Sequence, residues 1–127
     1  MFTRILCVAA GGALGSVSRY LVVVGMSRHV AGAFPWWTLA VNAAGSFLIG
    51  FVARIFYQGF PGHEFYWLFA VVGFLGGFTT FSAFSYELLL MLQKQQYALF
   101  ALNVSLHAAG CLAAVIAGYH VSKIIFS

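Results

Sequence analysis

Four long apolar segments alternate with short polar breaks along the chain. The segments run from about Phe2 to Gly25, Trp36 to Tyr57, Phe65 to Leu92 and Tyr97 to Phe126. The breaks carry Ser27-Arg28-His29, Gly59-Phe60-Pro61-Gly62-His63-Glu64 and Gln93-Lys94-Gln95-Gln96. Each segment has the ~20 residues that a helix needs to cross the hydrocarbon core of a bilayer. The pattern predicts an all-α integral membrane protein with four transmembrane helices in a single domain, residues 1–127.

The centre of the third segment is unusual for a membrane helix. Residues 73–85 read GFLGGFTTFSAFS, with three glycines and four hydroxyl side chains. The segment has about 28 residues, which is ~42 Å of straight helix and longer than the ~30 Å hydrocarbon core. Because lipid does not tolerate loose backbone amides, a helix broken here should line a cavity or hold an ion. We expect the break at Gly76-Gly77-Phe78-Thr79.

The composition supports the membrane class. Of 127 residues, 63% are hydrophobic, 18% are aromatic and 6% are charged, and the mean hydropathy is +0.98. Soluble domains carry about 25% charged residues, so a soluble core is excluded. The pI of about 9.4 comes from a few widely spread cations, which indicates flanks against a lipid bilayer and no nucleic-acid surface. Cys7 and Cys111 lie inside apolar segments without zinc or disulfide spacing, as small apolar filler does.

The flanking charges do not favour one orientation in the membrane. Four spans place both termini on the same side as the loop between the second and third spans. Arg4, Arg54 and Lys123 fall on that side, and Arg28, Lys94 and, where it reaches outward, Arg19 fall on the other. Such a balance leaves the positive-inside rule almost nothing to act on. Insertion both ways up would give an antiparallel, dual-topology homodimer; the alternative is one orientation fixed by features other than charge.

Small residues four positions apart recur in every span. The pairs are Gly11/Gly15, Gly12/Ser16, Ser46/Gly50, Gly73/Gly77 and Ala114/Gly118. Such pairs let helix backbones approach closely in membranes. We expect most of them to serve plain helix packing.

Three polar side chains inside the spans have two interpretations each. Asn42 is mid-span, where an unpaired amide is costly, so it either links helices or donates its NH₂ group to an anion. Arg19, near the end of the first span, either snorkels to the interface or draws anions into a vestibule. Glu87 is the one acid inside a span, and it indicates proton or cation chemistry unless it lies in water near the helix end.

The fourth span carries one weakly polar stripe. Asn103, His107 and Cys111 follow each other at intervals of four residues, which places them on one helix face. A buried histidine is more often a packing residue than a ligand. Both interpretations stay open for His107.

The residues after the glycines favour an anion pathway beside a structural cation. A half-helix that begins near Thr79 offers unpaired N–H groups and the positive end of its dipole. Phe81 and Phe84, three residues apart, face the same way and present electropositive ring edges, and Ser82 and Ser85 add hydroxyl groups. In an antiparallel dimer, the carbonyls freed at two breaks would share one monovalent cation. Alternatively, Thr79 caps a helix and the phenylalanines only pack.

Three motifs in this order resemble the CrcB/Fluc fluoride channels of microorganisms. They are GGALGSVSRY (11–20), TLAVNAAGS (38–46) and GFLGGFTTFSAFS (73–85), and the resemblance covers essentially the whole chain. It implies a dual-topology homodimer in the bacterial cytoplasmic membrane, with two fluoride pores and a structural sodium ion in the interface. It also implies passive fluoride export with high selectivity over chloride, which is ion conduction without an enzymatic reaction.

The resemblance also implies which residues form the site. They are the sodium-binding backbone carbonyls of Gly76 and Thr79, the pore-lining Phe81 and Phe84, the vestibule residues Asn42, Arg19 and Thr38, and the polar-track residues Ser82 and His107. The chain departs from the family pattern at Ala83 and Val115, where relatives carry threonine. It also departs at Asn103, His107 and Cys111, which replace hydroxyl-bearing or tyrosine positions of some members.

The alternative function is proton-coupled export of cationic drugs, as in the small multidrug resistance proteins. These are also four-span, dual-topology dimers, and Glu87 would be the proton carrier. Their working carboxylate lies in the first span, where this chain has Arg19 and no acid. A third class, a membrane scaffold without transport, accounts for the apolar composition but not for the hydroxyl-rich third span.

Overall fold

The computed structural model describes residues 1–30, 32–57 and 63–126. Within these ranges all regular elements are helical. They are α1 (Phe2–Ser27), α2 (Trp36–Tyr57), α3 (His63–Trp67), the π-helical segment η1 (Leu68–Leu75), α4 (Gly76–Phe78), α5 (Phe81–Gln93), α6 (Tyr97–Ser105), the π-helical segment η2 (Leu106–Gly110) and α7 (Cys111–Ile125).

Four stretches of helix are long and apolar enough to cross a membrane. By length and composition they are Phe2–Ser27, Trp36–Phe56, His63–Gln93 and Tyr97–Ile125. Each predicted segment lies within about two residues of one of these stretches, so the prediction of four membrane-spanning helices is confirmed. The predicted polar break at Gly59–Gly62 lies outside the described residues.

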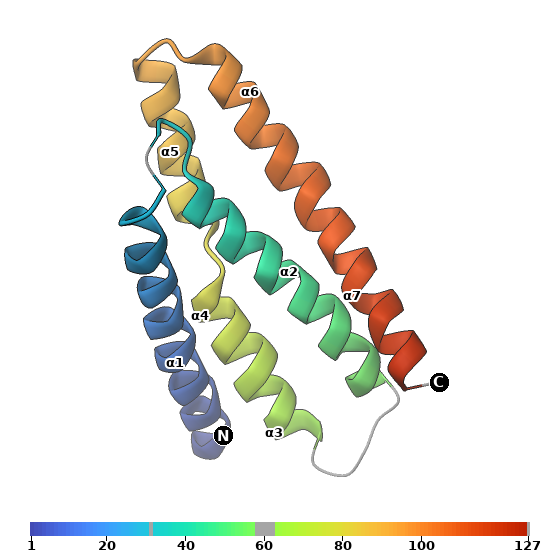
Figure 1. Cartoon of the computed structure of the whole chain (residues 1–127). Helices are drawn as coiled ribbons and strands as arrows, with labels where there is room; N and C mark the ends of the chain where they lie inside the picture. The colour runs from blue at the N-terminus through green and yellow to red at the C-terminus, as the bar shows by residue number, and fades with distance from the viewer. Residues whose placement is uncertain (31, 58–62, 127) are drawn as a thin grey trace.

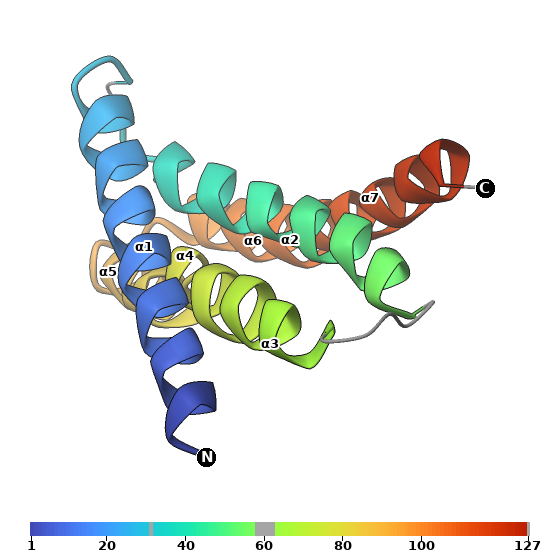
Figure 2. The same cartoon turned by 90° about the horizontal axis from the view of Figure 1, so that it is seen from below.

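The four spans run alternately up and down. In Figure 1 the N- and C-termini lie at the same, lower end of the molecule, as an even number of spans requires. Two pairs of spans pack most closely, namely α1 against η1 and α4, and α2 against α7. Figure 2, seen from below, shows α1 crossing beside α3 and α4 while α2 runs along α6 and α7.

Glycines form the seam between α1 and the third span. A Cβ on Gly11 or Gly15 would overlap the carbonyl oxygen of Phe69 or Phe74. On the opposite side, a Cβ on Gly73 would lie 2.8 Å from the Val8 carbonyl oxygen. Backbones that approach this closely leave no room for a side chain, so the small-residue pairs predicted here do pack helices.

The second seam joins α2 and α7 in the same way. A Cβ on Gly50 would overlap the Val115 backbone, and a Cβ on Gly118 would overlap the Phe47 carbonyl. The packing role predicted for these two glycines is therefore confirmed. Both seams are built from backbone contacts, so each pair of helices is held rigidly together.

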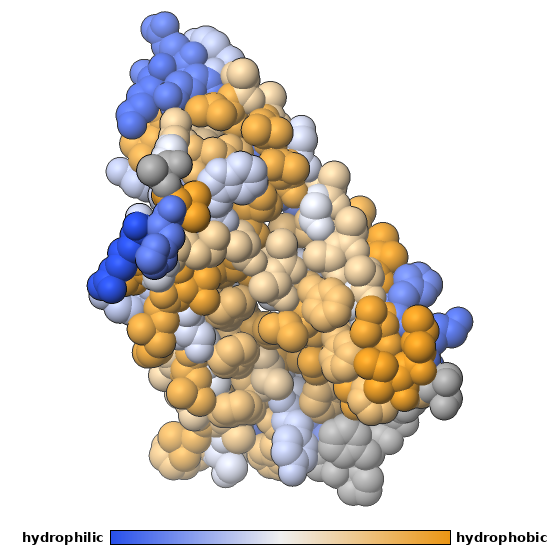
Figure 3. Space-filling model, in the orientation of Figure 1, coloured by the Kyte–Doolittle hydropathy of each residue, from blue (hydrophilic) through white to orange (hydrophobic). Residues whose placement is uncertain are grey.

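Large apolar side chains cover the outside of the spans. In Figure 3 most of the visible face is hydrophobic, and the most hydrophilic residues gather near its margins. Leu14, Phe81, Leu112 and Ile124 are all exposed in the single chain. Such a surface suits lipid or a second copy of the chain and does not suit water.

Candidate functional site

The third span contains two consecutive residues in extended conformation. Helix α4 ends at Phe78, and α5 begins at Phe81. Between them Thr79 has φ −79° and ψ 160°, and Thr80 has φ −151° and ψ 114°. The chain therefore leaves the helix for two residues and then resumes it in the same general direction (Figure 1).

The break was predicted at Gly76-Gly77-Phe78-Thr79; the first three residues are helical and Thr79 is extended, so the break lies further along the chain than the glycines indicated. Gly77 packs against α1, where a Cβ would lie 2.5 Å from the Gly12 carbonyl oxygen and 3.1 Å from the Ser16 nitrogen. This glycine is therefore required by a close helix crossing. The extended conformation falls on Thr79 and Thr80, since β-branched residues favour it.

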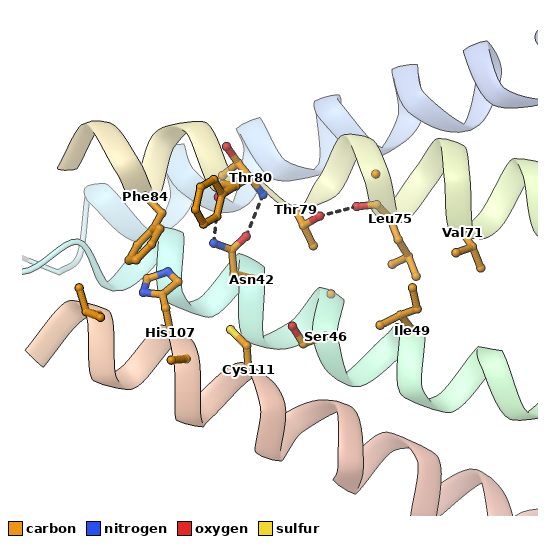
Figure 4. Close-up of a pocket in the computed structure, with 15 residues that line it drawn as sticks. Asn42, Ser46, Ile49, Val71, Leu75, Thr79, Thr80, Phe84, His107 and Cys111 are labelled. Atoms are coloured by element: carbon orange, nitrogen blue, oxygen red, sulfur yellow. Dashed lines mark hydrogen bonds between the residues drawn. The ribbon is translucent and has the colours of Figure 1, made fainter. Parts of the chain in front are cut away.

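Asn42 on α2 holds the extended segment in place. Its side-chain Nδ2 donates to the Thr80 carbonyl oxygen at 3.0 Å, and its Oδ1 accepts from the Thr80 backbone nitrogen at 2.8 Å (Figure 4). One amide group thus pairs with both polar groups of Thr80, as a neighbouring strand would. The linking role left open by the sequence is present, and the second hydrogen of Nδ2 stays available to another acceptor.

Thr80 also begins α5. Its hydroxyl accepts from the Ala83 backbone nitrogen at 3.2 Å, which is the contact of a helix N-cap, and lies 3.3 Å from the Ser82 hydroxyl. The cap is therefore Thr80 and not Thr79. In the described hydrogen-bond network, the backbone N–H groups of Phe81 and Ser82 have no helical acceptor, because the turn before them is extended.

The end of α4 presents backbone carbonyls in the same place. The helical donor for the Gly76 carbonyl would be the Thr80 nitrogen, which donates to Asn42 instead. The Thr79 carbonyl oxygen accepts only a long bond, 3.4 Å, from Arg19 Nη1 among the described contacts. The Thr79 nitrogen and hydroxyl both donate to the Leu75 carbonyl, at 3.0 and 2.8 Å. The interruption therefore leaves the Gly76 and Thr79 carbonyl oxygens and the Phe81 and Ser82 N–H groups without their usual helical partners.

A groove of about 560 Å³ opens beside this segment (Figure 4). It lies between α2, the α4–α5 junction and the fourth span. We call it the aromatic groove; its lining includes Asn42, Ser46, Gly76, Thr79, Thr80, Phe81, Phe84, His107 and Cys111. Most of the lining surface is apolar, with the polar groups concentrated near the extended segment.

The rings of this groove form a short row. The Phe81 and Phe84 centroids are 5.6 Å apart with the planes at 55°, and the Phe84 and His107 centroids are 4.2 Å apart at 35°. Phe84 is 9% exposed, whereas Phe81 is 78% exposed. The i, i+3 spacing thus places both phenylalanines at one groove, but the single chain covers only one of them.

A second groove of about 370 Å³ lies on the other side of Thr80. We call it the polar groove; its lining includes Ser16, Arg19, Trp37, Thr38, Thr80, Ala83 and Glu87. The Thr38 hydroxyl donates to Glu87 Oε1 in a short hydrogen bond. Glu87 Oε2 is buried and makes no well-formed hydrogen bond among the described residues, although the Asn103 side chain lies near this carboxylate. The predicted vestibule residues Arg19 and Thr38 therefore lie together, while Asn42 lies at the aromatic groove.

The polar stripe of the fourth span faces inward. Asn103 is 0% exposed, and both of its amide atoms lack a hydrogen-bond partner in the described structure. His107 is 8% exposed, and its Nδ1 lies 3.1 Å from the Asn103 carbonyl oxygen. Its Nε2 is buried without a partner among the described atoms. Cys111 lines the aromatic groove together with His107.

Sequence reasoning missed Thr80, the residue that borders both grooves. Its partner Asn42 lies 38 positions away, so no local pattern reveals the pairing. A signal was present, since a threonine directly before an apolar helical run is a common N-cap.

The fold and the site together define a multi-pass membrane protein in which an extended, polar segment of a spanning helix lies between two grooves. A family model described as "CrcB-like protein, Camphor Resistance (CrcB)" matches residues 6–119. The chain belongs to this CrcB family, as its three motifs predicted.

Curated relatives match most of the chain. A protein of Elusimicrobium minutum is 47% identical over 119 residues, which cover 93% of this chain and 92% of that protein. A protein of Nitrobacter winogradskyi is 40% identical over 124 residues, 98% of both chains, and one of Rhizobium meliloti is 50% identical over 93 residues, 73% and 74% of the two chains. Each of these relatives is named a fluoride-specific ion channel, FluC.

Proposed function

We propose that this chain forms a fluoride-selective channel that lets fluoride leave the cell passively across the bacterial cytoplasmic membrane. The observation that carries the proposal is the match to relatives named fluoride-specific ion channels over nearly the whole chain. The groups around Thr79–Thr80 support it, because they supply neutral hydrogen-bond donors next to aromatic ring edges. We place this extended segment near the middle of the membrane.

The channel is proposed to be an antiparallel homodimer. The exposure of Phe81, 78% in the single chain, supports a partner at this face, because an aromatic pore residue must be enclosed to exclude lipid. Gly76 supports it as well. A Cβ on Gly76 would meet nothing closer than the Val71 carbonyl oxygen at 3.9 Å, so the surface beside it is open to another backbone.

A structural sodium ion is part of the proposal, held by the backbone carbonyls of Gly76 and Thr79 from both copies. The donor chemistry fits, because carbonyl oxygens are hard ligands that suit a hard cation. The Gly76 carbonyl has lost its helical donor to Asn42, and the Thr79 carbonyl has only the long Arg19 contact in the described structure. A bound cation would compensate these carbonyls in a lipid environment, where they are costly to leave unpaired.

Fluoride is proposed to pass from the polar groove side toward the aromatic groove. Arg19 attracts it into a wet vestibule next to Thr38, whose hydroxyl hydrogen is taken by Glu87. Fluoride then sheds water onto the second Asn42 Nδ2 hydrogen, at the aromatic groove, and onto the nearby Ser82 hydroxyl. It then passes the edges of Phe81 and Phe84 in a passage too narrow for chloride. Fluoride is strongly hydrated, so it needs dense donors, but binding must stay weak enough for release.

His107 is proposed to border this path. A carbonyl oxygen only accepts hydrogen bonds, so the contact with the Asn103 carbonyl assigns the proton of a neutral ring to Nδ1. Nε2 then carries a lone pair and offers no hydrogen to an anion. His107 donates to fluoride only in its doubly protonated form.

Fluoride efflux from liposomes that contain the purified protein tests the proposal, with a fluoride electrode as the detector and chloride efflux as the control. Rapid, voltage-driven fluoride release with negligible chloride release is the expected result. Fluoride that stays trapped by folded, dimeric protein would refute it. Glu87 is the group that proton-coupled drug export would use, but the curated relatives carry the name of an ion channel and not of a drug exporter.

A further inference from the structure

The buried nitrogen of His107 is an unexplained polar group in the aromatic groove. His107 is more than nine-tenths buried, yet its Nε2 has no hydrogen-bond partner among the described residues. A buried polar atom without a partner is costly, and it calls for a ligand or another compensating group. Because Nδ1 donates to the Asn103 carbonyl, Nε2 presents a lone pair, which binds cations and protons and repels anions.

Cys111 lies one turn further along the same face. Figure 4 shows His107 and Cys111 on the side of the fourth span that faces α2 and α5, and both residues line the aromatic groove. The two residues lie one turn apart on the same helix and line the same groove, so both side chains can approach one ion there. The connecting turn is η2 (Leu106–Gly110), and π-helical turns are frequent at functional sites.

We propose that His107 Nε2 and Cys111 Sγ form a binding site for a soft monovalent metal ion, Cu(I) or Ag(I). Thiolate sulfur selects soft ions, and imidazole is a good second ligand. On binding, the Cys111 thiol releases its proton to water as the sulfur–metal bond forms, and the Nε2 lone pair makes the second bond. No electron is transferred.

The surroundings select a monovalent, two-coordinate ion. Among the described residues, no three His, Cys, Asp or Glu side chains are grouped to hold one metal, so one chain supplies no set of three or four ligands for zinc. One thiolate offsets the single positive charge of the ion, which leaves a neutral complex in a mostly apolar groove. A divalent ion would leave a net charge there, and burying it is costly.

A metal ion at this site also lies in the proposed path of fluoride, between Phe84 and the Asn42 side of the groove. We therefore expect it to obstruct conduction. This second consequence rests on the proposed fluoride function, whereas metal binding does not.

Silver binding to the purified full-length chain tests the site. In the Cys7→Ser protein, Cys111 of the proposed site is the only thiol. The matched control is the Cys111→Ser protein, whose only thiol is Cys7 on α1. A third protein, Cys7→Ser with His107→Phe, keeps a ring against Phe84 but removes the nitrogen. Affinities for Ag(I) are measured in competition with thiosulfate, and X-ray absorption identifies the ligand atoms.

The expected result is one sulfur and one nitrogen ligand in the Cys7→Ser protein, and sulfur without nitrogen in the other two. The Ag(I) affinity of these two proteins should be lower than that of the Cys7→Ser protein by at least about tenfold. A loss of this size is already seen when a residue that only supports a metal ligand is removed, and here a ligand itself is removed. Equal affinities with sulfur-only coordination in all three proteins would overturn the site.

Fluoride efflux with and without saturating Ag(I) tests the obstruction separately. If silver inhibits efflux through the Cys7→Ser protein but not through the Cys7→Ser/Cys111→Ser protein, the obstruction is supported. If the Cys7→Ser protein binds silver and its efflux is not inhibited, the obstruction is overturned. A protein that binds silver as expected but never conducts fluoride would contradict the proposed function and leave the metal site standing.

Discussion

The aromatic groove and the polar groove share Thr80 but present opposite chemistry. The polar groove contains Arg19 and Glu87, whereas the aromatic groove contains rings, an amide and hydroxyl groups and no Lys, Arg, Asp or Glu side chain among its described lining. A fixed positive charge in a narrow, dry passage would trap an anion, because electrostatic interactions strengthen as water is excluded. In the proposed path, the positive charge of Arg19 attracts the ion at the entrance, and neutral donors carry it onward.

The two grooves also differ in how completely one chain builds them. In the polar groove, Thr38 and Glu87 are joined by a hydrogen bond within the chain. In the aromatic groove, Phe81 remains largely exposed, and the Gly76 surface is open. The aromatic groove is therefore the one whose function depends most on a second copy, and substitutions there should have the larger effects.

The largest effect is expected for Asn42→Leu, which removes the two hydrogen bonds that hold Thr80 between the two grooves. Leucine has a similar volume but leaves both backbone polar groups of Thr80 without their partner. We expect the free energy of unfolding to fall by about 2–4 kcal/mol and fluoride efflux to be lost. Thermal unfolding in detergent and liposome efflux measure the two effects. The control is Ser46→Ala, one turn along α2 and away from the Thr80 peptide. Equal stability of the two variants would refute a stabilising role for the Asn42–Thr80 hydrogen bonds.

Gly76→Val should separate assembly from folding. The single chain has room for the new side chain, since nothing lies within 3.9 Å of its Cβ, so the monomer should fold. At a dimer axis the same side chain would block the approach of two backbones and of the proposed sodium ion. We expect a monomer by size in detergent and no sodium dependence of stability. Gly25→Val, also in open space on α1, is the control. A stable Gly76→Val dimer that still responds to sodium would place the ion elsewhere.

Phe81→Ile removes an aromatic edge from the aromatic groove and keeps an apolar surface. We expect fluoride efflux to fall by about 2- to 13-fold while the dimer still assembles, because the aromatic interaction that is lost is worth about 0.5–1.5 kcal/mol. Phe65→Ile on α3, an exposed phenylalanine outside both grooves, should keep wild-type efflux. Wild-type flux in the Phe81 variant would show that the ring edge has no part in conduction.

Glu87→Gln tests the polar groove and should have the smallest effect. The glutamine carbonyl oxygen can still accept from Thr38, so the local structure is kept. A passive channel should retain efflux within about threefold, the effect of less than 1 kcal/mol. A proton-coupled exporter would lose transport altogether. Loss of all flux in this variant, with normal assembly, would favour the exporter.

Most of the fold could be predicted from the sequence because the length of an apolar run decides whether it spans a bilayer. The glycine pairs were also informative, since Gly73 and Gly118 lie where backbones touch. The position of the extended residues could not be derived locally. Gly77 is helical because α1 needs its missing side chain, and Thr80 is extended because Asn42, far away in sequence, takes its hydrogen bonds.

The structure shows where the predicted site residues lie, and their arrangement could be derived from the sequence only in part. Phe81 and Phe84 do lie at one groove, as their spacing of three residues indicated, and His107 of the fourth span lies there with them, which no spacing indicated. The proton position on His107 could not be foreseen, because it follows from the contact between Nδ1 and the Asn103 carbonyl. The division into two grooves depends on how the spans cross, and no single segment encodes it.

The most direct test of the central claim is the reversal potential of the current that the reconstituted protein carries across a planar bilayer. A fluoride gradient is imposed, while chloride and pH are equal on both sides. The account predicts a current that reverses at the fluoride equilibrium potential and does not move when a proton gradient is added. A reversal potential that follows the proton gradient, or the absence of any fluoride current from dimeric protein, would contradict it.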